Sequence, residues 1–177
     1  MMMTLVIGGA ASGKSEFAEE LVLNAGNLPR YYIATMQPFD DECRARIRRH
    51  REMRAKKQFT TVECFVNLEQ VTLPQKGVVL LECMSNLAAN ELYSPDGAGD
   101  DAVASIQRGI RHLKSQCEEL VIVSNEVFSG GSDYEGDTLR YLRVLAEVNR
   151  MLAKEADTVY EVVCGCSVCH KGKGRTE

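Results

Sequence analysis

The sequence predicts an α/β fold of three layers, in which a mostly parallel central sheet lies between two layers of helices. First, short apolar β-like runs alternate with longer helical stretches along the 177 residues, which is typical of βαβ units. Second, the runs 78–81 and 120–123 are apolar without interruption, as expected of central strands that are buried on both faces. Third, a glycine-rich segment joins the first expected strand to the first expected helix.

The order of the elements follows from apolar patterns and from the turn residues between them. We expect strands near residues 4–8, 31–35, 60–64, 77–82, 120–124 and 158–164. We expect helices near residues 14–25, 40–57, 85–93, 101–117 and 137–155. The segments 94–101 and 129–136 are rich in glycine and in small polar residues and are expected to be loops. Residues 170–177 are expected to form a flexible tail.

Composition and charge limit the class of protein. Hydrophobic residues make up 45% and charged residues 26% of the chain, which is ordinary for a globular protein, and residues 1–177 are expected to form a single domain. We expect neither a signal peptide nor a membrane span, since no charged-then-apolar leader and no apolar run near 18 residues is present. The net charge of −4 argues against nucleic acid as a partner. Seven cysteines without a secretion signal indicate reduced thiols and a cytoplasmic location.

The segment Gly8–Ser15 carries the complete pattern Gly-x4-Gly-Lys-Ser. A β-favouring run, 5–7, precedes it, and a helix with Phe17 and Leu21 on one face follows, so the motif has the context that it requires. A glycine- and serine-rich turn that binds nothing is the alternative. In the motif, backbone N–H groups cradle phosphate, the lysine reaches the outer phosphates and the serine binds Mg²⁺. We therefore expect a P-loop NTPase (RecA-like) fold that binds a nucleoside triphosphate through Gly8, Gly9, Ala10, Ala11, Ser12, Gly13, Lys14 and Ser15.

The helix expected at residues 40–57 is strongly basic, and its first turn is acidic, in agreement with the helix dipole. His50 lies in its middle, and Arg46 and Arg54 lie one turn away on the same face. Such a face suits phosphate chemistry, because guanidinium groups bind phosphate oxygens while the imidazole attacks or donates a proton. One alternative is a solvated basic helix with an incidental histidine. Another is a nucleic-acid-binding helix, which no interleaved aromatic residues support.

An acidic residue, Glu82, ends the apolar run 78–81. This is the position of the Walker B carboxylate, which holds Mg²⁺ directly or through water beside the P-loop. We expect Ser15 and Glu82 to be the metal ligands. The alternative is an ordinary strand-end acid that faces solvent.

An ordered set of segments spans nearly the whole chain: residues 8–15, 32–35, 41–51, 61–63, 80–83 with Asn90, 123–127 and 149–159. Together these segments resemble the bifunctional adenosylcobinamide kinase/adenosylcobinamide-phosphate guanylyltransferase family of cobalamin biosynthesis. The segments 128–135 and 139–143 match the family's pattern only loosely. The cluster Cys164, Cys166, Cys169 and His170 is also unusual. It is cramped for a tetrahedral zinc site, so we expect free thiols.

The resemblance implies two reactions. One phosphorylates the aminopropanol hydroxyl of adenosylcobinamide with ATP or GTP. The other transfers GMP from GTP to that phosphate through a covalent GMP–histidine intermediate, which gives adenosylcobinamide-GDP. A guanylyltransferase alone, a small-molecule P-loop kinase and a nucleotide-dependent nucleic-acid-binding module are the alternatives.

The resemblance also implies roles for particular residues. It makes His50 the nucleophile, and Lys14 and His50 are the expected catalytic residues. It suggests a homotrimer that uses Mg²⁺ with GTP and ATP. Nucleotide contacts then extend beyond the P-loop to Ala34, Thr35, Met36, Arg51, Glu52, Met53, Arg54, Glu63 and Glu82.

Overall fold

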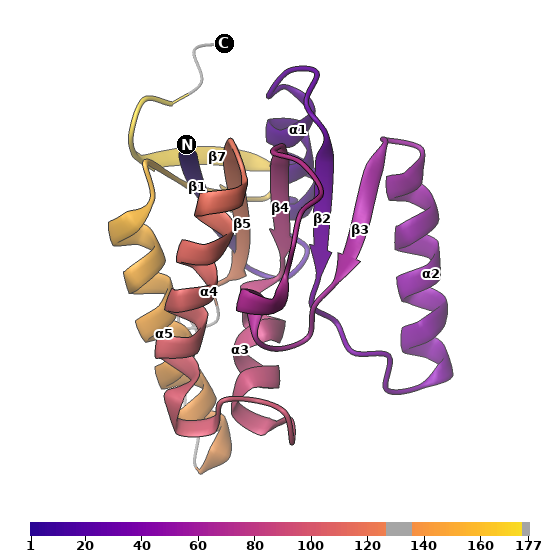
Figure 1. Ribbon diagram of the computed structural model, residues 1–177. Coiled ribbons are helices and arrows are strands. Elements are labelled where there is room, and N and C mark those ends of the chain that lie inside the picture. The colour runs from indigo at the N-terminus through magenta and orange to yellow at the C-terminus, as the bar shows by residue number, and fades with distance from the viewer. Residues whose placement is uncertain (127–135, 175–177) are drawn as a thin grey trace.

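The computed structural model describes residues 1–126 and 136–174, and a sheet of seven strands lies at its centre (Figure 1). The order across the sheet is β3-β2-β4-β5-β1-β6-β7. The first six strands in this order are mutually parallel, and β7 pairs antiparallel with β6. The strands are β1 (Met2–Gly8), β2 (Arg30–Ala34), β3 (Phe59–Glu63), β4 (Val78–Glu82), β5 (Glu119–Asn125), β6 (Thr158–Val163) and β7 (Cys166–Lys171).

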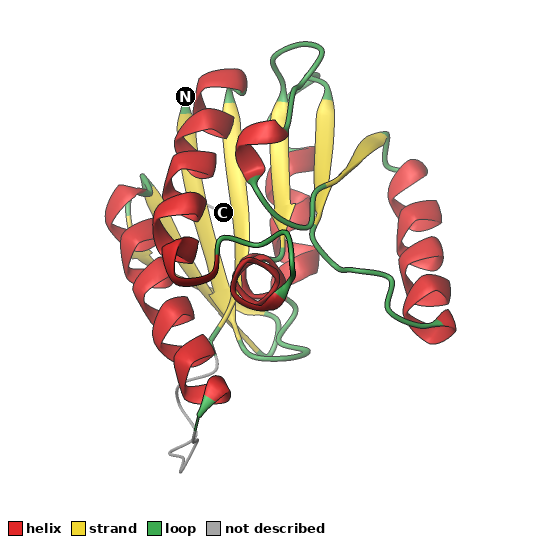
Figure 2. Ribbon diagram, turned by 60° about the horizontal axis from the view of Figure 1, so that its bottom comes forward, coloured by secondary structure: helices red, strands yellow, loops and turns green. Residues whose placement is uncertain are grey.

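Helices cover both faces of the sheet, which confirms the expected three-layer α/β fold (Figure 2). Helices α3, α4 and α5 pack on one face and α1 packs on the other. Helix α2 stands at the edge of the sheet, beside β3. The helices are α1 (Lys14–Leu23), α2 (Asp41–Ala55), α3 (Met84–Tyr93), α4 (Ala102–Gln116) and α5 (Asp137–Glu155), with the short 3₁₀ turns η1 (Leu68–Gln70) and η2 (Gly99–Asp101). None of the helices in the described ranges is long and apolar enough to cross a lipid bilayer.

The continuous apolar runs of β4 and β5 divide their side chains between two cores. In β4, Val79 and Leu81 point into the larger core under α3, α4 and α5, whereas Val78 and Leu80 point into the smaller core under α1. This division follows from the two-residue period of a strand, which sends successive side chains to opposite faces. Both faces are covered, so both sets of side chains are apolar and the run has no polar gaps.

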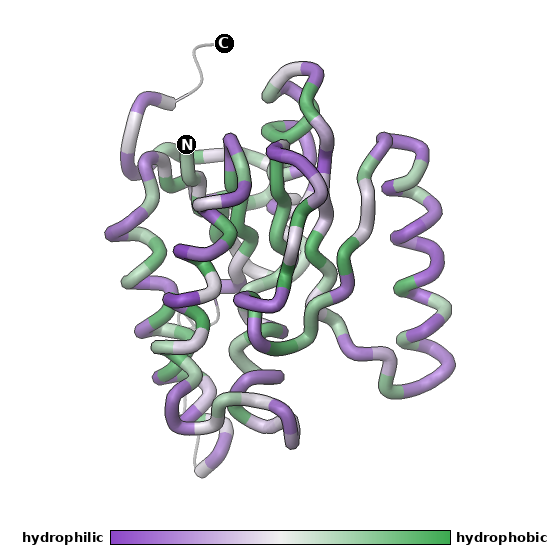
Figure 3. The backbone as a smooth tube through the Cα atoms, in the orientation of Figure 1, coloured by the Kyte–Doolittle hydropathy of each residue, from purple (hydrophilic) through white to green (hydrophobic). Residues whose placement is uncertain are grey.

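Helix α2 lacks an apolar face, and the hydrophilic colour along most of its length shows this (Figure 3). Arg54 is its single buried residue. Local interactions therefore stabilise much of the helix: the side chain of Asp40 accepts a hydrogen bond from the Cys43 N–H at 2.7 Å, which lowers the pKa of Asp40. Asp41 and Glu42 follow in the first turn and complement the helix dipole.

The C-terminal residues differ from expectation, because β7 occupies part of the tail that was expected at 170–177. All six residues of β7 are exposed, so the strand has no apolar alternation by which the sequence could predict it. His170 and Lys171 are nevertheless ordered: Lys171 Nζ donates to the carbonyls of Ala153 and Lys154 at the end of α5. Of the loop expected at 129–136, only Gly136 falls within the described residues.

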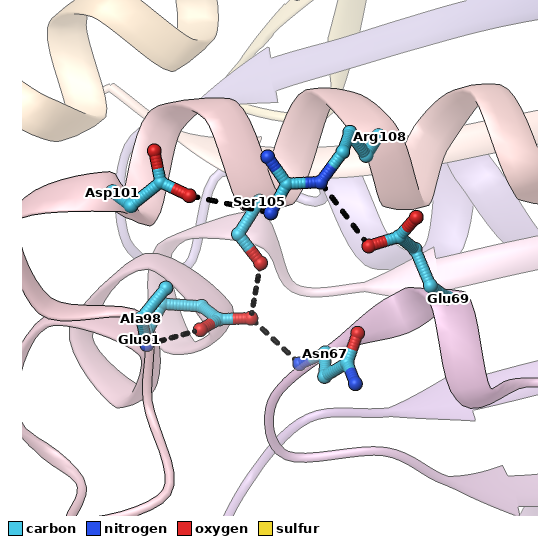
Figure 4. Close-up of polar contacts among 7 residues, drawn as sticks. All are labelled: Asn67, Glu69, Glu91, Ala98, Asp101, Ser105 and Arg108. Atoms are coloured by element: carbon cyan, nitrogen blue, oxygen red, sulfur yellow. Dashed lines mark hydrogen bonds and ion pairs between the residues drawn. The ribbon is translucent and has the colours of Figure 1, made fainter.

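Glu91 on α3 is a buried carboxylate, 2% exposed, that joins three segments (Figure 4). It accepts hydrogen bonds from the Asn67 N–H at 2.6 Å, from the Ala98 N–H at 2.8 Å and from the Ser105 hydroxyl at 3.3 Å. These bonds attach the chain before η1 and the chain before η2 to the helical face of the sheet. The two backbone donors have no comparable partner if the carboxylate is removed.

We expect Glu91→Ala to lower the free energy of unfolding by about 1–3 kcal/mol, because it leaves two part-buried N–H groups without their carboxylate partner. Urea denaturation measures this loss. The matched control is Glu69→Ala, whose exposed carboxylate pairs with Arg108 at 3.2 Å and should change stability little. Equal losses of unfolding free energy in the two variants would show that the hydrogen bonds of Glu91 stabilise the protein no more than an exposed ion pair does.

Candidate active site

The P-loop turns tightly between β1 and α1, and two glycines permit the turn. Gly13 has a φ of 93°, in the left-handed region that side chains rarely adopt. A Cβ on Gly8 would lie only 2.5 Å from Ser12 Oγ. Lys14 is a buried residue, 9% exposed, and its ammonium donates to the Gly9 carbonyl at 2.9 Å and is thereby held over the loop.

The sheet order brings Glu82 to the P-loop. Strand β5 lies between β1 and β4, and all three are parallel, so their carboxyl ends meet at one edge of the sheet. At this edge the Ser15 hydroxyl donates to Glu82 Oε1, and the Tyr32 hydroxyl donates to Oε2 at 3.2 Å. Burial and the charge of Glu82 raise the pKa of Tyr32 well above its ordinary value, so the phenol remains a donor at neutral pH.

The Ser15 hydroxyl and the Glu82 carboxylate fit the requirements of Mg²⁺. Both are oxygen ligands of the kind that this ion prefers, and they already meet through a hydrogen bond. A site with two protein ligands leaves coordination positions for phosphate oxygens and water, as is usual for Mg²⁺ at nucleotide sites. Across residues 1–126 and 136–174, no group of three or more His, Cys, Asp or Glu side chains is placed to hold a metal. This range includes the cluster of Cys164, Cys166, Cys169 and His170.

A cavity of about 350 Å³ opens beside the P-loop, between the ends of the central strands and α2. His50, from the middle of α2, lines the same cavity as Lys14 and Ser15. The histidine and the P-loop are 35 positions apart in the sequence, and only the packing of α2 beside β3 brings them together. The lining residues are Lys14, Ser15, Tyr32, Ala34, Thr35, Met36, Arg46, Ile47, His50, Arg54, Glu63, Glu82, Cys83, Asn86, Val123 and Asn125.

The structure brings most of the expected site residues together, though not all. Ala34, Thr35, Met36, Glu63 and Glu82 line the cavity with the P-loop and with His50. The P-loop residues from Ala11 to Gly13 line a separate hollow, together with Gly165. Three expected residues on α2 do not line the main cavity: Arg51 lines a neighbouring one, and the exposed Glu52 and Met53 line neither.

The sequence interpretation missed Tyr32 and Asn125. Tyr32 lies within an apolar strand, and nothing in the local sequence marks it as a contact of Glu82. Asn125 carries a signal that could have been used, because it follows the apolar run of β5 directly and pairs in register with Gly8 of the P-loop. A polar residue at the carboxyl end of a parallel strand is a typical ligand-contact position.

Arg54 is a buried cation that lies against the cavity. The residue is 5% exposed, and its guanidinium carbon lies 3.6 Å from the centroid of the Tyr32 ring, within cation–π range. Its Nε is buried and has no hydrogen-bond partner among the described residues. Because a buried charged group is normally paired, this guanidinium is well placed to receive an anion.

Fold and site together define a P-loop nucleotide-binding protein of RecA-like architecture. Solved structures agree on the fold: the RadB recombinase aligns with a TM-score of 0.52 at 14% identity, covering 99% of this chain and 83% of that one. The KaiC-like protein PH0186 of Pyrococcus horikoshii OT3 aligns with a TM-score of 0.53 at 8% identity, covering 97% and 80%. At these identities the likeness concerns the fold alone.

The chain belongs to the cobinamide kinase / cobinamide phosphate guanyltransferase family of transferases, whose model matches residues 4–169. It is 37% identical to the bifunctional adenosylcobalamin biosynthesis protein CobU of Salmonella typhimurium, over 94% of this chain and 98% of that protein. The CobU of Escherichia coli K12 has the same identity and coverage. The CobP protein of Pseudomonas aeruginosa is 28% identical, over 97% of this chain and 99% of that protein. These findings confirm the family that the ordered motifs indicated.

We expect Arg54→Met to weaken GTP binding about tenfold or more, because it removes a cation that can bond to phosphate. The free energy of unfolding without nucleotide should stay the same or rise, since the change removes a buried charge that has no acidic hydrogen-bond partner within residues 1–126 and 136–174. GTP titration and urea denaturation measure the two effects. Arg49→Met, at an exposed position outside the cavity, is the control. An unchanged GTP affinity in Arg54→Met would contradict the assignment.

Proposed function

We propose that this chain carries out both reactions of its family. In the first, ATP or GTP phosphorylates the aminopropanol hydroxyl of adenosylcobinamide. In the second, GMP passes from GTP to the new phosphate through His50. The observation that carries the proposal is the shared cavity, which Lys14, Ser15, Glu82 and His50 all line. Membership of the family supports the choice of a corrinoid and a nucleotide as the two substrates.

In the kinase reaction the chain acts by holding and neutralising the triphosphate. The backbone of residues 8–13 surrounds the phosphates, and Lys14 places its ammonium against the outer ones. Ser15 and Glu82 would hold Mg²⁺, which supplies positive charge beside the phosphates when bound. The substrate hydroxyl attacks the γ-phosphorus, the bond to the β–γ bridging oxygen breaks, and the nucleoside diphosphate leaves. Because this chemistry needs mainly position and charge, no covalent contribution from the chain is required.

In the guanylyl transfer a side chain of the protein becomes the temporary acceptor. An imidazole nitrogen of His50 attacks the α-phosphorus of GTP, and pyrophosphate leaves. Arg46 and Arg54 line the cavity one turn on either side of His50, and they neutralise charge on the phosphates during this step. The phosphate of adenosylcobinamide phosphate then displaces the imidazole. The covalent intermediate divides one difficult displacement into two.

Glu63 is our candidate for recognition of guanine. It ends β3 and lines the cavity that His50 and the P-loop share. A carboxylate accepts hydrogen bonds from N1–H and N2–H₂ of guanine, whereas adenine presents no such pair of donors. The exposed Arg51 lies 3.3 Å from the same carboxylate.

We further propose that the enzyme is a single domain, is located in the cytoplasm and assembles as a homotrimer. Cytoplasmic location agrees with seven cysteines that are all free thiols in the described structure. The trimer rests on the resemblance to the family. The net charge of −4 supports small substrates rather than nucleic acid as partners.

We expect His50→Ala to abolish covalent labelling of the protein by α-labelled GTP, because no other residue replaces the nucleophile. Transfer of the γ-phosphate to adenosylcobinamide should be retained within a few-fold. Mass spectrometry of the peptide that contains His50 locates the label. His112→Ala is the control, since His112 lies on α4 and does not line the cavity. A ring nitrogen of His112 lies 2.8 Å from the Val71 carbonyl oxygen. Labelling that survives His50→Ala would contradict the mechanism, and γ-transfer without any α-labelling would identify a kinase alone.

We expect Glu63→Gln to weaken GTP binding at least about tenfold more than ATP binding, because an amide cannot accept both guanine donors as a carboxylate does. Equilibrium titration with each nucleotide measures the ratio. Glu118→Gln is the control, since Glu118 lies at the opposite edge of the sheet, just before β5. Equal losses for GTP and ATP would exclude a role in base recognition.

A further inference from the structure

Helix α2 divides its arginines between two cavities. Arg46 and Arg54 line the P-loop cavity together with His50. Arg44, Arg48 and Arg51 line a second cavity of about 310 Å³. Their spacing of four and three residues places these three on one face of the helix. At 3.6 residues per turn, the centre of this face lies about 130° around the helix from the face of His50.

The second cavity adjoins the first. Met36, Ile47 and Glu63 line both cavities, so the two share a wall. The remaining walls of the second cavity are Pro38, from the segment that leads into α2, and Phe65, from the segment after β3. The second cavity therefore combines three cations and one carboxylate, that of Glu63, with several apolar side chains. This combination suits a phosphate that is attached to an apolar arm.

The cations of the second cavity are available to an anion. Arg48 makes no hydrogen bond or ion pair with any described residue, and its side chain is exposed. Arg44 pairs with Asp41 at 3.1 Å and Arg51 pairs with Glu63 at 3.3 Å. Both pairs are exposed to solvent, and such pairs contribute little stability. A doubly charged phosphate monoester can therefore replace these partners at small cost.

We propose that the second cavity binds the phosphate monoester of the acceptor, adenosylcobinamide phosphate, during GMP transfer. This inference rests on the proposed function, because it assumes that GMP is first attached to His50. The triphosphate has its own cations in the P-loop cavity, from Lys14, Arg46 and Arg54. The acceptor phosphate carries about two negative charges and needs a separate set of cations, which Arg44, Arg48 and Arg51 supply in the cavity that shares a wall with the cavity of His50.

The transfer step exchanges one bond to phosphorus for another. An oxygen of the acceptor phosphate forms a bond to the phosphorus of the GMP on His50. The phosphorus–nitrogen bond breaks, and its electron pair stays on the imidazole nitrogen, which takes up one proton from solvent. The product is a diphosphate that joins the corrinoid to guanosine, and His50 is regenerated. The arginines bind the entering phosphate and do not touch the bond that breaks.

The test measures two steps separately: the attachment of labelled GMP to the protein, called loading, and the transfer of that GMP to the acceptor, called discharge. The protein is loaded with α-labelled GTP, freed of nucleotide, and then mixed with increasing concentrations of adenosylcobinamide phosphate. The variants are Arg48→Gln and the double variant Arg44→Gln with Arg48→Gln. Arg49→Gln is the matched control, because Arg49 lies next to Arg48 on the same helix and lines neither cavity. Labelling of each variant also shows that it is folded.

We expect equal labelling of all variants. The acceptor concentration for half-maximal discharge should rise at least about tenfold in Arg48→Gln and further in the double variant, with a nearly unchanged rate at saturation. Arg49→Gln should match the unaltered protein. Normal discharge in both test variants would overturn the inference and leave the proposed function standing. Loss of labelling in the test variants would assign these arginines to GTP instead and would also overturn it. If the unaltered protein takes up no label, the proposed function itself fails, and this inference fails with it.

Discussion

One line of contacts connects the P-loop to the helix that carries the histidine. The Ser15 hydroxyl donates to Glu82, the Tyr32 hydroxyl donates to the same carboxylate, and the Arg54 guanidinium lies over the Tyr32 ring. Two strands and two helices meet in this line, because Ser15 lies in the first turn of α1, Tyr32 lies in β2, Glu82 ends β4 and Arg54 lies in the last turn of α2. The position of His50, one turn before Arg54, depends on it.

This arrangement explains why α2 can lack an apolar face. Most surface helices are held by a buried apolar stripe, but α2 buries only Arg54 and is otherwise maintained by its N-cap and its acidic first turn. Its remaining faces are then free to carry arginines toward cavities on two sides. Burial of an arginine stabilises a protein less than burial of a leucine, so the helix exchanges stability for positive charge beside the phosphates.

The sequence predicted the fold well where a short segment or a repeated pattern of residues decides the local structure. The runs 78–81 and 120–123 are apolar because both faces of β4 and β5 are covered, and the P-loop requires glycine where its backbone is left-handed or crowded. Prediction failed at β7, which is exposed throughout and is held by pairing with β6 and by Lys171 at the end of α5. It also missed Tyr32, because a tyrosine in a strand looks the same whether or not it contacts a carboxylate.

The sequence by itself determined the class of protein and the candidate chemical groups of its site: the P-loop, the carboxylate that ends β4, and a histidine among arginines. These are properties of short segments, in which residue type and spacing decide backbone shape and charge. The tertiary structure alone decided that His50 and Lys14 line one cavity and that the arginines of α2 serve two. The physical reason is that β5 inserts between β1 and β4 while α2 lies beyond β3. Distances between segments far apart in the chain depend on this order and on no single segment.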